Sequence, residues 1–288
     1  MNKKHGAWSK NEKIFFGLLA PILVLFFCFN TLPLIKGFYY GLTNFRGYGS
    51  YDFVGLRNFA EIFQDSRVGH SYLFTFKYAL VMTIVVNLLS LILALGLNSK
   101  IRGKNALRGI YFVPNILGGL VVGYIFSFIF TYILPTIGEV TGIDFLKTSL
   151  LGSTKWAWIA IVIVGAWQGI AMNTIIYISG LQTVPEEVYG ASGWKKFKSI
   201  TLPLIMPFVT INLVLCMKNA LMVFDQIMSL TKGGPSQSTE SISYLIYNNG
   251  MSGGQFGFQS ANAFVFFIVI VAISLFQMKF LGSKEEQL

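Results

Sequence analysis

A small group of side chains in one apolar stretch could bind a polyhydroxylated molecule without covalent chemistry. The group consists of Trp167, Gln168, Gly169 and Asn173. An aromatic ring stacks on the apolar face of a sugar, while amide groups form hydrogen bonds with its hydroxyls. Helix packing is the structural alternative, because Gly169 would let a neighbouring helix approach closely. The pattern leaves both interpretations open.

A second apolar stretch carries Asn212, Lys218, Asn219, Asp225 and Gln226. A charge at the centre of a membrane span costs ~2.5–3.5 kcal/mol on insertion scales, so such residues are candidates for a solute pathway. Lys218 and Asp225 are seven residues apart and would share one helix face. They could line a cavity or bind polar groups of a partner subunit. Alternatively, they satisfy each other or neighbouring backbone groups, or Lys218 snorkels to the membrane surface.

The sequence carries no motif that indicates catalysis. It has no GxSxG nucleophile elbow and no GxxxxGK[ST] phosphate loop, so we expect no ATP hydrolysis by this chain and no cofactor or metal in it. His5 and His70 fall on opposite sides of the topology derived below and cannot form a dyad. Cys28 and Cys216 lie in apolar segments without metal spacing, and both are expected to be buried.

The composition indicates a membrane protein. Of the 288 residues, 54% are hydrophobic and 12% are charged, and the mean hydropathy is +0.62. Soluble domains average about 25% charged residues. The net charge of +10 does not indicate nucleic-acid binding, because the basic residues lie in short loops between apolar runs.

Six segments are apolar enough to cross a membrane, and such spans must be helical because their backbone groups need internal partners. We therefore expect an all-α integral membrane protein with one six-span domain, residues 14–281. The first segment is too long for a signal peptide and is expected to be a retained span. The predicted spans are 14–35, 72–98, 106–134, 156–180, 204–230 and 260–281.

The basic residues predict the orientation. The loop with Lys100, Arg102, Lys104 and Arg108 contains no acidic residue, which is typical of a cytoplasmic loop. The tails 1–13 and 282–288 are then cytoplasmic, and the chain is a multi-pass protein of the cell membrane.

The loop 181–203 lies on the same predicted side. Ala191, Trp194, Phe197 and Ile200 recur every three residues, with lysines between them, and Pro203 ends the pattern. This predicts a short amphipathic helix at the cytoplasmic surface. It could lie in the lipid headgroups, or it could insert its aromatic rings into a groove of a cytosolic partner.

The spacing of Gly190, Ile200 and Leu202-Pro203 is similar to the second half of the EAA motif of ABC importer permeases. The chain therefore resembles the carbohydrate-uptake branch of this family, which includes the maltose and glycerol-phosphate permeases. The resemblance covers nearly the whole chain. Further segments that carry it are 53–59, 102–104, 113–114, 181–189, 224–227 and 230–235.

The resemblance implies the fold of a type I ABC importer permease with a cytoplasmic coupling helix that sits in an ATPase cleft. It implies import of a sugar, such as an oligosaccharide, along a pathway lined from the third, fourth and fifth spans. The implied ATPase-coupling residues are Glu186, Glu187, Gly190, Ala191, Ser192, Gly193, Trp194, Phe197, Ile200, Leu202 and Pro203. The predicted pathway residues are Asn115, Gly119, Trp167, Gln168, Gly169, Asn173, Lys218, Asn219 and Asp225.

The implied partners are a second homologous permease, two cytosolic ABC ATPases that hold ATP and Mg, an external solute-binding protein and the lipid bilayer, but no nucleic acid. In one respect the sequence departs from the family. Glu186 and Glu187 lie so close to Gly190 that about six residues of the family's pattern are absent. Either the loop is shortened or the printed sequence omits a stretch. Import of another polar solute, such as glycerol-phosphate or a polyamine, and ion-coupled transport are the functional alternatives.

Overall fold

The computed structural model describes residues 10–98, 109–110, 113–184 and 197–285, and these residues are predominantly helical. The described residues contain no strand, only an isolated antiparallel bridge between Thr43 and Phe53. The chain divides into two compact units, one comprising residues 1–62 and 249–265, the other residues 63–248 and 266–288.

Five helical stretches among the described residues are long and apolar enough to cross a membrane. A sixth results if Phe197–Leu204 and Met206–Leu221, which meet at an angle of 67°, count as one broken span. The predicted all-α membrane fold is confirmed. The five stretches are Ile14–Gly41, Ser66–Asn98, Gly119–Thr141, Ala157–Leu181 and Phe256–Gly282.

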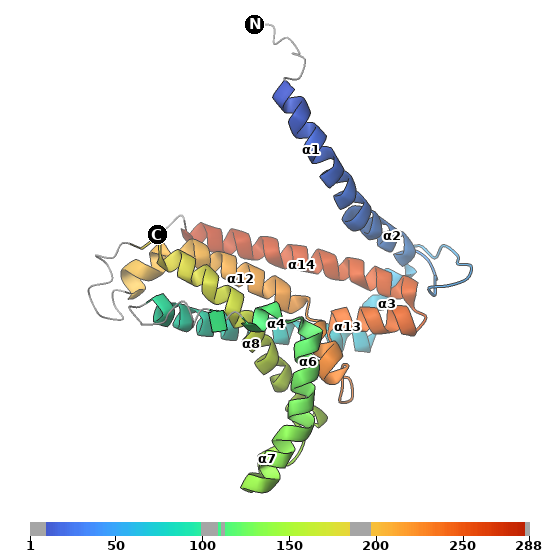
Figure 1. The fold of residues 1–288 in the computed structure, drawn as a ribbon. Helices are drawn as coiled ribbons and strands as arrows, with labels where there is room; N and C mark the ends of the chain where they lie inside the picture. Colours follow the sequence, from blue (N-terminus) through green and yellow to red (C-terminus); the bar gives the residue numbers. More distant parts are fainter. Residues whose placement is uncertain (1–9, 99–108, 111–112, 185–196, 286–288) are drawn as a thin grey trace. The chain divides into compact units, whose positions relative to one another are not determined.

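The first unit begins with one long helical rod. Helix α1 (Lys10–Phe26) continues through a π-helical turn into α2 (Leu32–Gly41), drawn in blue in Figure 1. The π-helical turn ends at Thr31, two residues before Pro33, which cannot donate a backbone hydrogen bond. This rod extends beyond the predicted span 14–35. Cys28 lies on it and is exposed, so the expectation of a buried thiol holds for Cys216 but is wrong for Cys28.

The end of α2 is fixed by side-chain hydrogen bonds. Asn58, in α3 (Arg57–Ile62), donates from its amide to the backbone oxygens of Gly41 and Thr43, both at 2.8 Å. Gly41 packs on Ala261 so closely that a Cβ at Gly41 would lie 3.0 Å from the Ala261 Cα atom. The connection after the first span is thus well packed at its start.

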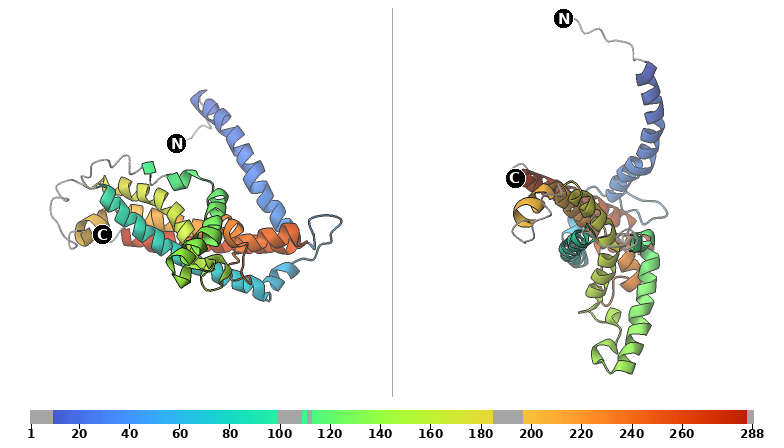
Figure 2. Two further views of the ribbon diagram at one scale, coloured as in Figure 1. Left: turned by 60° about the horizontal axis from the view of Figure 1, so that its bottom comes forward. Right: turned by 60° about the vertical axis from the view of Figure 1, so that its left-hand side comes forward.

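Three helices form the centre of the second unit. Helices α4 (Ser66–Asn98), α8 (Ala157–Leu181) and α12 (Met206–Leu221) pack side by side in Figures 1 and 2. Glycine makes the contact of α4 with α8 close, because a Cβ at Gly165 would lie 2.6 Å from the Tyr78 hydroxyl oxygen. A larger side chain at Gly165 would therefore not fit between these two helices.

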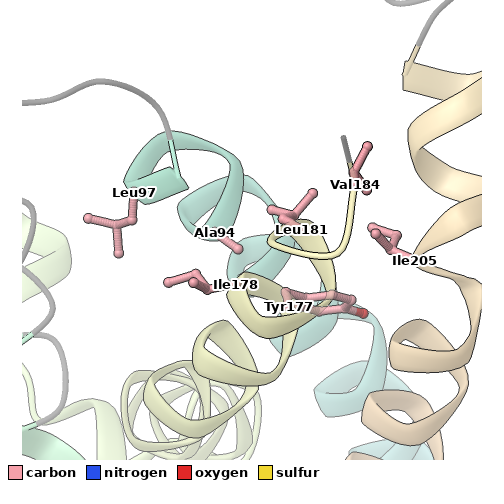
Figure 3. Close-up of a cluster of buried hydrophobic side chains, with 7 residues drawn as sticks. All are labelled: Ala94, Leu97, Tyr177, Ile178, Leu181, Val184 and Ile205. Atoms are coloured by element: carbon pink, nitrogen blue, oxygen red, sulfur yellow. The ribbon is translucent and has the colours of Figure 1, made fainter. Parts of the chain in front are cut away.

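A buried apolar cluster joins the C-terminal ends of α4 and α8 (Figure 3). Val184 and Ile205 belong to it, although they flank residues 185–196, which lie outside the described part of the chain. The chain on both sides of the predicted coupling segment is therefore anchored to the same core. The cluster consists of Ala94, Leu97, Tyr177, Ile178, Leu181, Val184 and Ile205.

The predicted third span is interrupted. Residues 113–116 are helical, residues 117 and 118 are not, and α6 (Gly119–Phe128) then begins. From there the helix continues through a π-helical turn into α7 (Leu134–Thr141). The prediction of one continuous helix over 106–134 is therefore wrong at residues 117–118. Gly118, at the start of α6, has an extended conformation, and glycine leaves the helical conformation at low cost.

The predicted fifth span, 204–230, is also not one helix. Its start is bent by 67° at Ile205, where Pro207 in the first turn of α12 lacks a backbone donor. Its second half is interrupted at Val223 and Phe224, before a π-helical segment, η6 (Ile227–Thr231). The buried Ser241 donates to the Val223 oxygen at 2.9 Å, which satisfies a carbonyl group at this interruption.

Candidate functional site

A cavity of about 330 Å³ lies where the two interrupted segments meet the three central helices of the second unit. Its walls come from α4, α8 and α12 and from residues at both interruptions. The lining residues include no charged side chain and five amides. They are Tyr78, Met82, Val86, Asn115, Leu117, Gly119, Gly165, Gln168, Gly169, Asn173, Cys216, Asn219, Ala220, Val223 and Gln226.

Hydrogen bonds through two of these amides connect three segments of the chain. Gln226, just after the interruption of the fifth span, donates from Nε2 to Oε1 of Gln168 at 3.0 Å. Gln168, on α8, donates in turn to the backbone oxygen of Leu117 at 3.5 Å. Leu117 lies at the interruption of the third span. The chain of bonds therefore runs across the cavity wall from one interruption to the other.

A second pair of amides forms hydrogen bonds with backbone groups. Asn173 donates to the oxygen of Gly169 one turn earlier, at 2.8 Å, and Asn212 donates to the oxygen of Asn173 at 3.2 Å. Asn212 is fully buried, and its Oδ1 has no hydrogen-bond partner among the described residues. Asn212 thus ties α12 to α8 just behind the cavity wall.

Glycines on α6 allow the segment after the second interruption to pack directly on that helix. A Cβ at Gly119 would lie 2.5 Å from Oδ2 of Asp225. A Cβ at Gly123 would overlap the Ser229 hydroxyl. Asp225 is therefore packed against α6 and does not line the cavity, although Gly119 does. The predicted partner of Asp225 on the same face, Lys218, is exposed and also lies outside the lining.

Trp167 is separated from the amides beside it in the sequence. Its ring packs near Phe126, with the ring centroids 5.3 Å apart, and 41% of the residue is exposed. It lines a different, apolar pocket with Leu93, Ile110, Val113, Pro114 and Ile170. Successive residues on a helix point about 100° apart, so Trp167 and Gln168 face different surroundings. Of the predicted pathway residues, the structure brings together Asn115, Gly119, Gln168, Gly169, Asn173 and Asn219.

The cavity also contains residues that the sequence did not single out for it. Gln226 was noted as polar but was not among the predicted pathway residues, and its amide within an apolar segment was the only signal. Tyr78, Met82 and Cys216 carried no signal, because apolar and aromatic residues fill every span of this chain. These residues reach the cavity only because α4 and α12 both pack on α8.

The predicted coupling segment is described only in part. Glu186, Glu187, Gly190, Ala191, Ser192, Gly193 and Trp194 lie outside the described residues. Phe197 and Ile200 fall in a π-helical turn, Phe197–Thr201, which leads into α11 (Leu202–Leu204) with Pro203 in its first turn. Leu202 packs on the apolar cluster of Figure 3. This part of the segment is therefore joined to the core that holds α4 and α8.

The lining of the cavity is suited to hydrogen bonding. The described residues contain no group of three or more His, Cys, Asp or Glu side chains placed to hold a metal ion. The uncharged lining offers donors and acceptors from amides in a space of about 330 Å³. This arrangement can bind a neutral, hydroxyl-rich solute through hydrogen bonds.

Comparison with known proteins gives the family. Residues 86–284 match the family described as binding-protein-dependent transport system inner membrane component. The chain is 38% identical over 271 residues to the multiple sugar-binding transport system permease protein MsmF of Streptococcus mutans, covering 91% of this chain and 92% of that protein. It is 32% identical over 289 residues to the probable starch degradation products transport system permease protein AmyD of Thermoanaerobacterium thermosulfurigenes, covering 98% of each.

A solved structure shares the fold. A bacterial ABC transporter involved in the import of the acidic polysaccharide alginate contains a chain that matches with a TM-score of 0.81 at 20% identity, over 95% of this chain and 96% of that one. The match over the whole fold agrees with the family match over most of the sequence. The chain belongs to the family of inner membrane components of binding-protein-dependent transport systems.

Proposed function

We propose that this permease forms the pathway through which a sugar enters the cell, powered by ATP hydrolysis in partner subunits. The observation that carries the proposal is the uncharged, amide-lined cavity at the two interrupted segments. The names of the relatives support it, since they include a multiple sugar-binding system, a starch degradation products system and a trehalose/maltose system of Thermococcus litoralis.

The chemistry of the lining suits a sugar in particular. Each amide offers both a donor and an acceptor, which matches the hydroxyl groups of a carbohydrate. Asn115, Gln168 and Asn219 come from three different segments and converge on one space. The volume of about 330 Å³ lies at the lower end of typical small-molecule sites. Asn219 and Gln226 are thus proposed as sugar contacts, together with the other amides.

The proposed energy source is a pair of cytosolic ABC ATPases that bind ATP and Mg. The coupling residues Glu186 to Pro203 would sit in an ATPase cleft. Movement there would reach the cavity because Val184 and Ile205 share a core with α4 and α8, and these helices line the cavity. A second permease and an external solute-binding protein complete the proposed complex, with both termini of this chain in the cytoplasm.

The cavity is tested by sugar uptake into vesicles that contain the whole complex, with the binding protein and ATP supplied. Gln168→Ala should lower uptake ~10-fold, about the effect of losing a hydrogen bond to the solute. Gln64→Ala is the matched control, because Gln64 is exposed and lies outside the cavity lining. Equal uptake by both variants would remove the cavity from the pathway.

The coupling segment is tested separately. Replacing Trp194 and Phe197 together by Ala should abolish co-purification of the ATPase subunits while the permease remains in the membrane. Uptake should also require ATP and persist when ion gradients are collapsed by ionophores. Intact ATPase association, or uptake that depends on an ion gradient alone, would contradict ATP coupling.

A further inference from the structure

A second cavity lies at the N-terminal end of α4, which the proposed topology places on the external side of the membrane. Its volume is about 320 Å³, and it forms between α4 and the loop before α13 (Ile242–Tyr247). The α4 residues recur every three or four positions, so they form one stripe along the helix. The lining residues are Arg67, His70, Ser71, Leu73, Phe74, Lys77, Ser236, Gln237, Ser238 and Glu240.

Arg67 is held in place by the only carboxylate of this lining. Its Nε and Nη2 donate to the two oxygens of Glu240 at 2.8 and 2.7 Å. Glu240 is 3% exposed, so both of its oxygens are used in this pair and little negative charge faces the cavity. The pKa of the neighbouring Tyr244 is raised, mainly by burial and also by the negative charge of Glu240. This phenol is therefore uncharged at neutral pH.

Lys77 gives the cavity its uncompensated positive charge. Its Nζ lies 4.1 Å from the centroid of the Trp158 ring, and no carboxylate lies within ion-pair distance among the described residues. A ring contact leaves the ammonium hydrogens free to donate on the other side. Lys77 and Arg67 are ten residues apart, about 15 Å along the helix, and His70 lies between them.

The opposite wall is a tightly held loop with an unused hydroxyl group. The Thr239 hydroxyl donates to the Gly234 oxygen at 2.6 Å and accepts from the Thr231 hydroxyl at 2.8 Å, which fixes the loop. Ser236 and Gln237 both have positive φ angles, 50° and 61°, a conformation that costs energy for residues other than glycine. The Ser238 hydroxyl is buried and has no hydrogen-bond partner among the described residues.

We propose that this cavity binds a phosphate-type oxyanion, with Lys77 as the charged contact and Ser238 as a further donor, while Arg67 remains paired with Glu240. An oxyanion would match the net positive lining and could accept from the buried hydroxyl. Its source is either inorganic phosphate or the headgroup of an anionic lipid. A lipid source fits the position of Lys77 beside Trp158, because tryptophan is enriched at the membrane–water interface. The site is separate from the amide-lined cavity, with which it shares no residue.

The first arm of the test uses the delipidated full-length protein in a phosphate-free, non-ionic detergent. Binding of labelled inorganic phosphate is measured at equilibrium. Lys77→Gln should weaken binding ~10-fold or more, the effect of losing one charge-assisted hydrogen bond. Lys77→Arg should largely restore it. Lys155→Gln is the matched control, because Lys155 also lies over a tryptophan, 5.2 Å from the Trp156 ring, but does not line the cavity.

The second arm identifies the source of the anion. Native mass spectrometry compares retention of phosphatidylglycerol with that of phosphatidylcholine in the same variants. A lipid headgroup would be supported if Lys77→Gln abolishes retention of phosphatidylglycerol and Lys155→Gln preserves it. A soluble anion would be supported if binding of inorganic phosphate depends on Lys77. If the two lysine variants behave alike in both arms, the proposal is overturned. Unfolding temperatures without ligand establish that each variant is folded.

Discussion

The side-chain amide of Gln226 donates to that of Gln168 at 3.0 Å, which links the interruption of the fifth predicted span to the middle of α8. Gln168 extends the link to Leu117, at the interruption of the third. Irregular backbone within a membrane is tolerated where it is buried in protein or lines a cavity. Both interruptions meet this condition here, since residues from each of them line the cavity of about 330 Å³.

Replacing Gln226 by Leu should impair transport more than folding. The variant removes the donor to Gln168 and one amide from the cavity, while it keeps the size of the side chain approximately constant. We expect the KM for the sugar to rise ~10-fold, because one hydrogen bond to a neutral solute is worth on the order of 1 kcal/mol or slightly more. Uptake kinetics in reconstituted vesicles measure the change. Gln182→Leu, at an exposed position after α8, should leave KM unchanged.

Gly123 should tolerate no side chain. Gly123→Ala places a methyl group on the Ser229 hydroxyl, and overpacking of this kind costs ~1–3 kcal/mol. The unfolding temperature in detergent should fall. The additional change Ser229→Gly should recover much of the loss, because it removes the atoms that collide. Gly69→Ala, on α4 with open space at its Cβ position, should be neutral or slightly stabilising, and an equal loss there would argue against a specific clash.

Ser241 should be important for the second interruption. Its hydroxyl donates to the Val223 oxygen at 2.9 Å and accepts from the Tyr244 backbone nitrogen at 3.2 Å, as the N-cap of α13. Ser241→Ala leaves a buried carbonyl and a helix terminus without these partners, which costs ~1–3 kcal/mol. Thermal unfolding would show the loss. Ser243→Ala, in the first turn of the same helix, is the control and should change the unfolding temperature little.

The sequence predicted the class of fold, because apolar length and the scarcity of charge leave few alternatives. It did not predict that helices would stop at residues 117–118 and 223–224. Hydropathy stays high across both interruptions, and the hydrogen bond that satisfies Val223 comes from Ser241, eighteen residues later. A pattern confined to one segment cannot reveal a partner supplied by another.

The polar residues within the spans were easier to identify from the sequence than their surroundings. The amides were identified because a polar group within a membrane span is energetically costly and is therefore often functional. Six of the nine predicted pathway residues line the cavity. The three that do not are Trp167, Lys218 and Asp225, and their orientations depend on helix packing. The pair Arg67 and Glu240 was not anticipated at all, since 173 residues separate its members.

Ile205 should be required for communication between the coupling segment and the cavity. It is fully buried in the cluster of Figure 3, so Ile205→Ala should cost ~2–5 kcal/mol through loss of contacts and the cavity left behind. Under the proposed function, a complex that still assembles should hydrolyse ATP with less stimulation by the loaded binding protein, because movement at Phe197–Leu204 would reach α4 and α8 less directly.

The measurement is the ratio of stimulated to basal ATP hydrolysis. Leu204→Ala is the neighbouring control, since Leu204 is 49% exposed and lies outside the cluster. A lowered ratio in the Leu204 variant alone would place the path of communication on the exposed side of this turn instead of in the buried core.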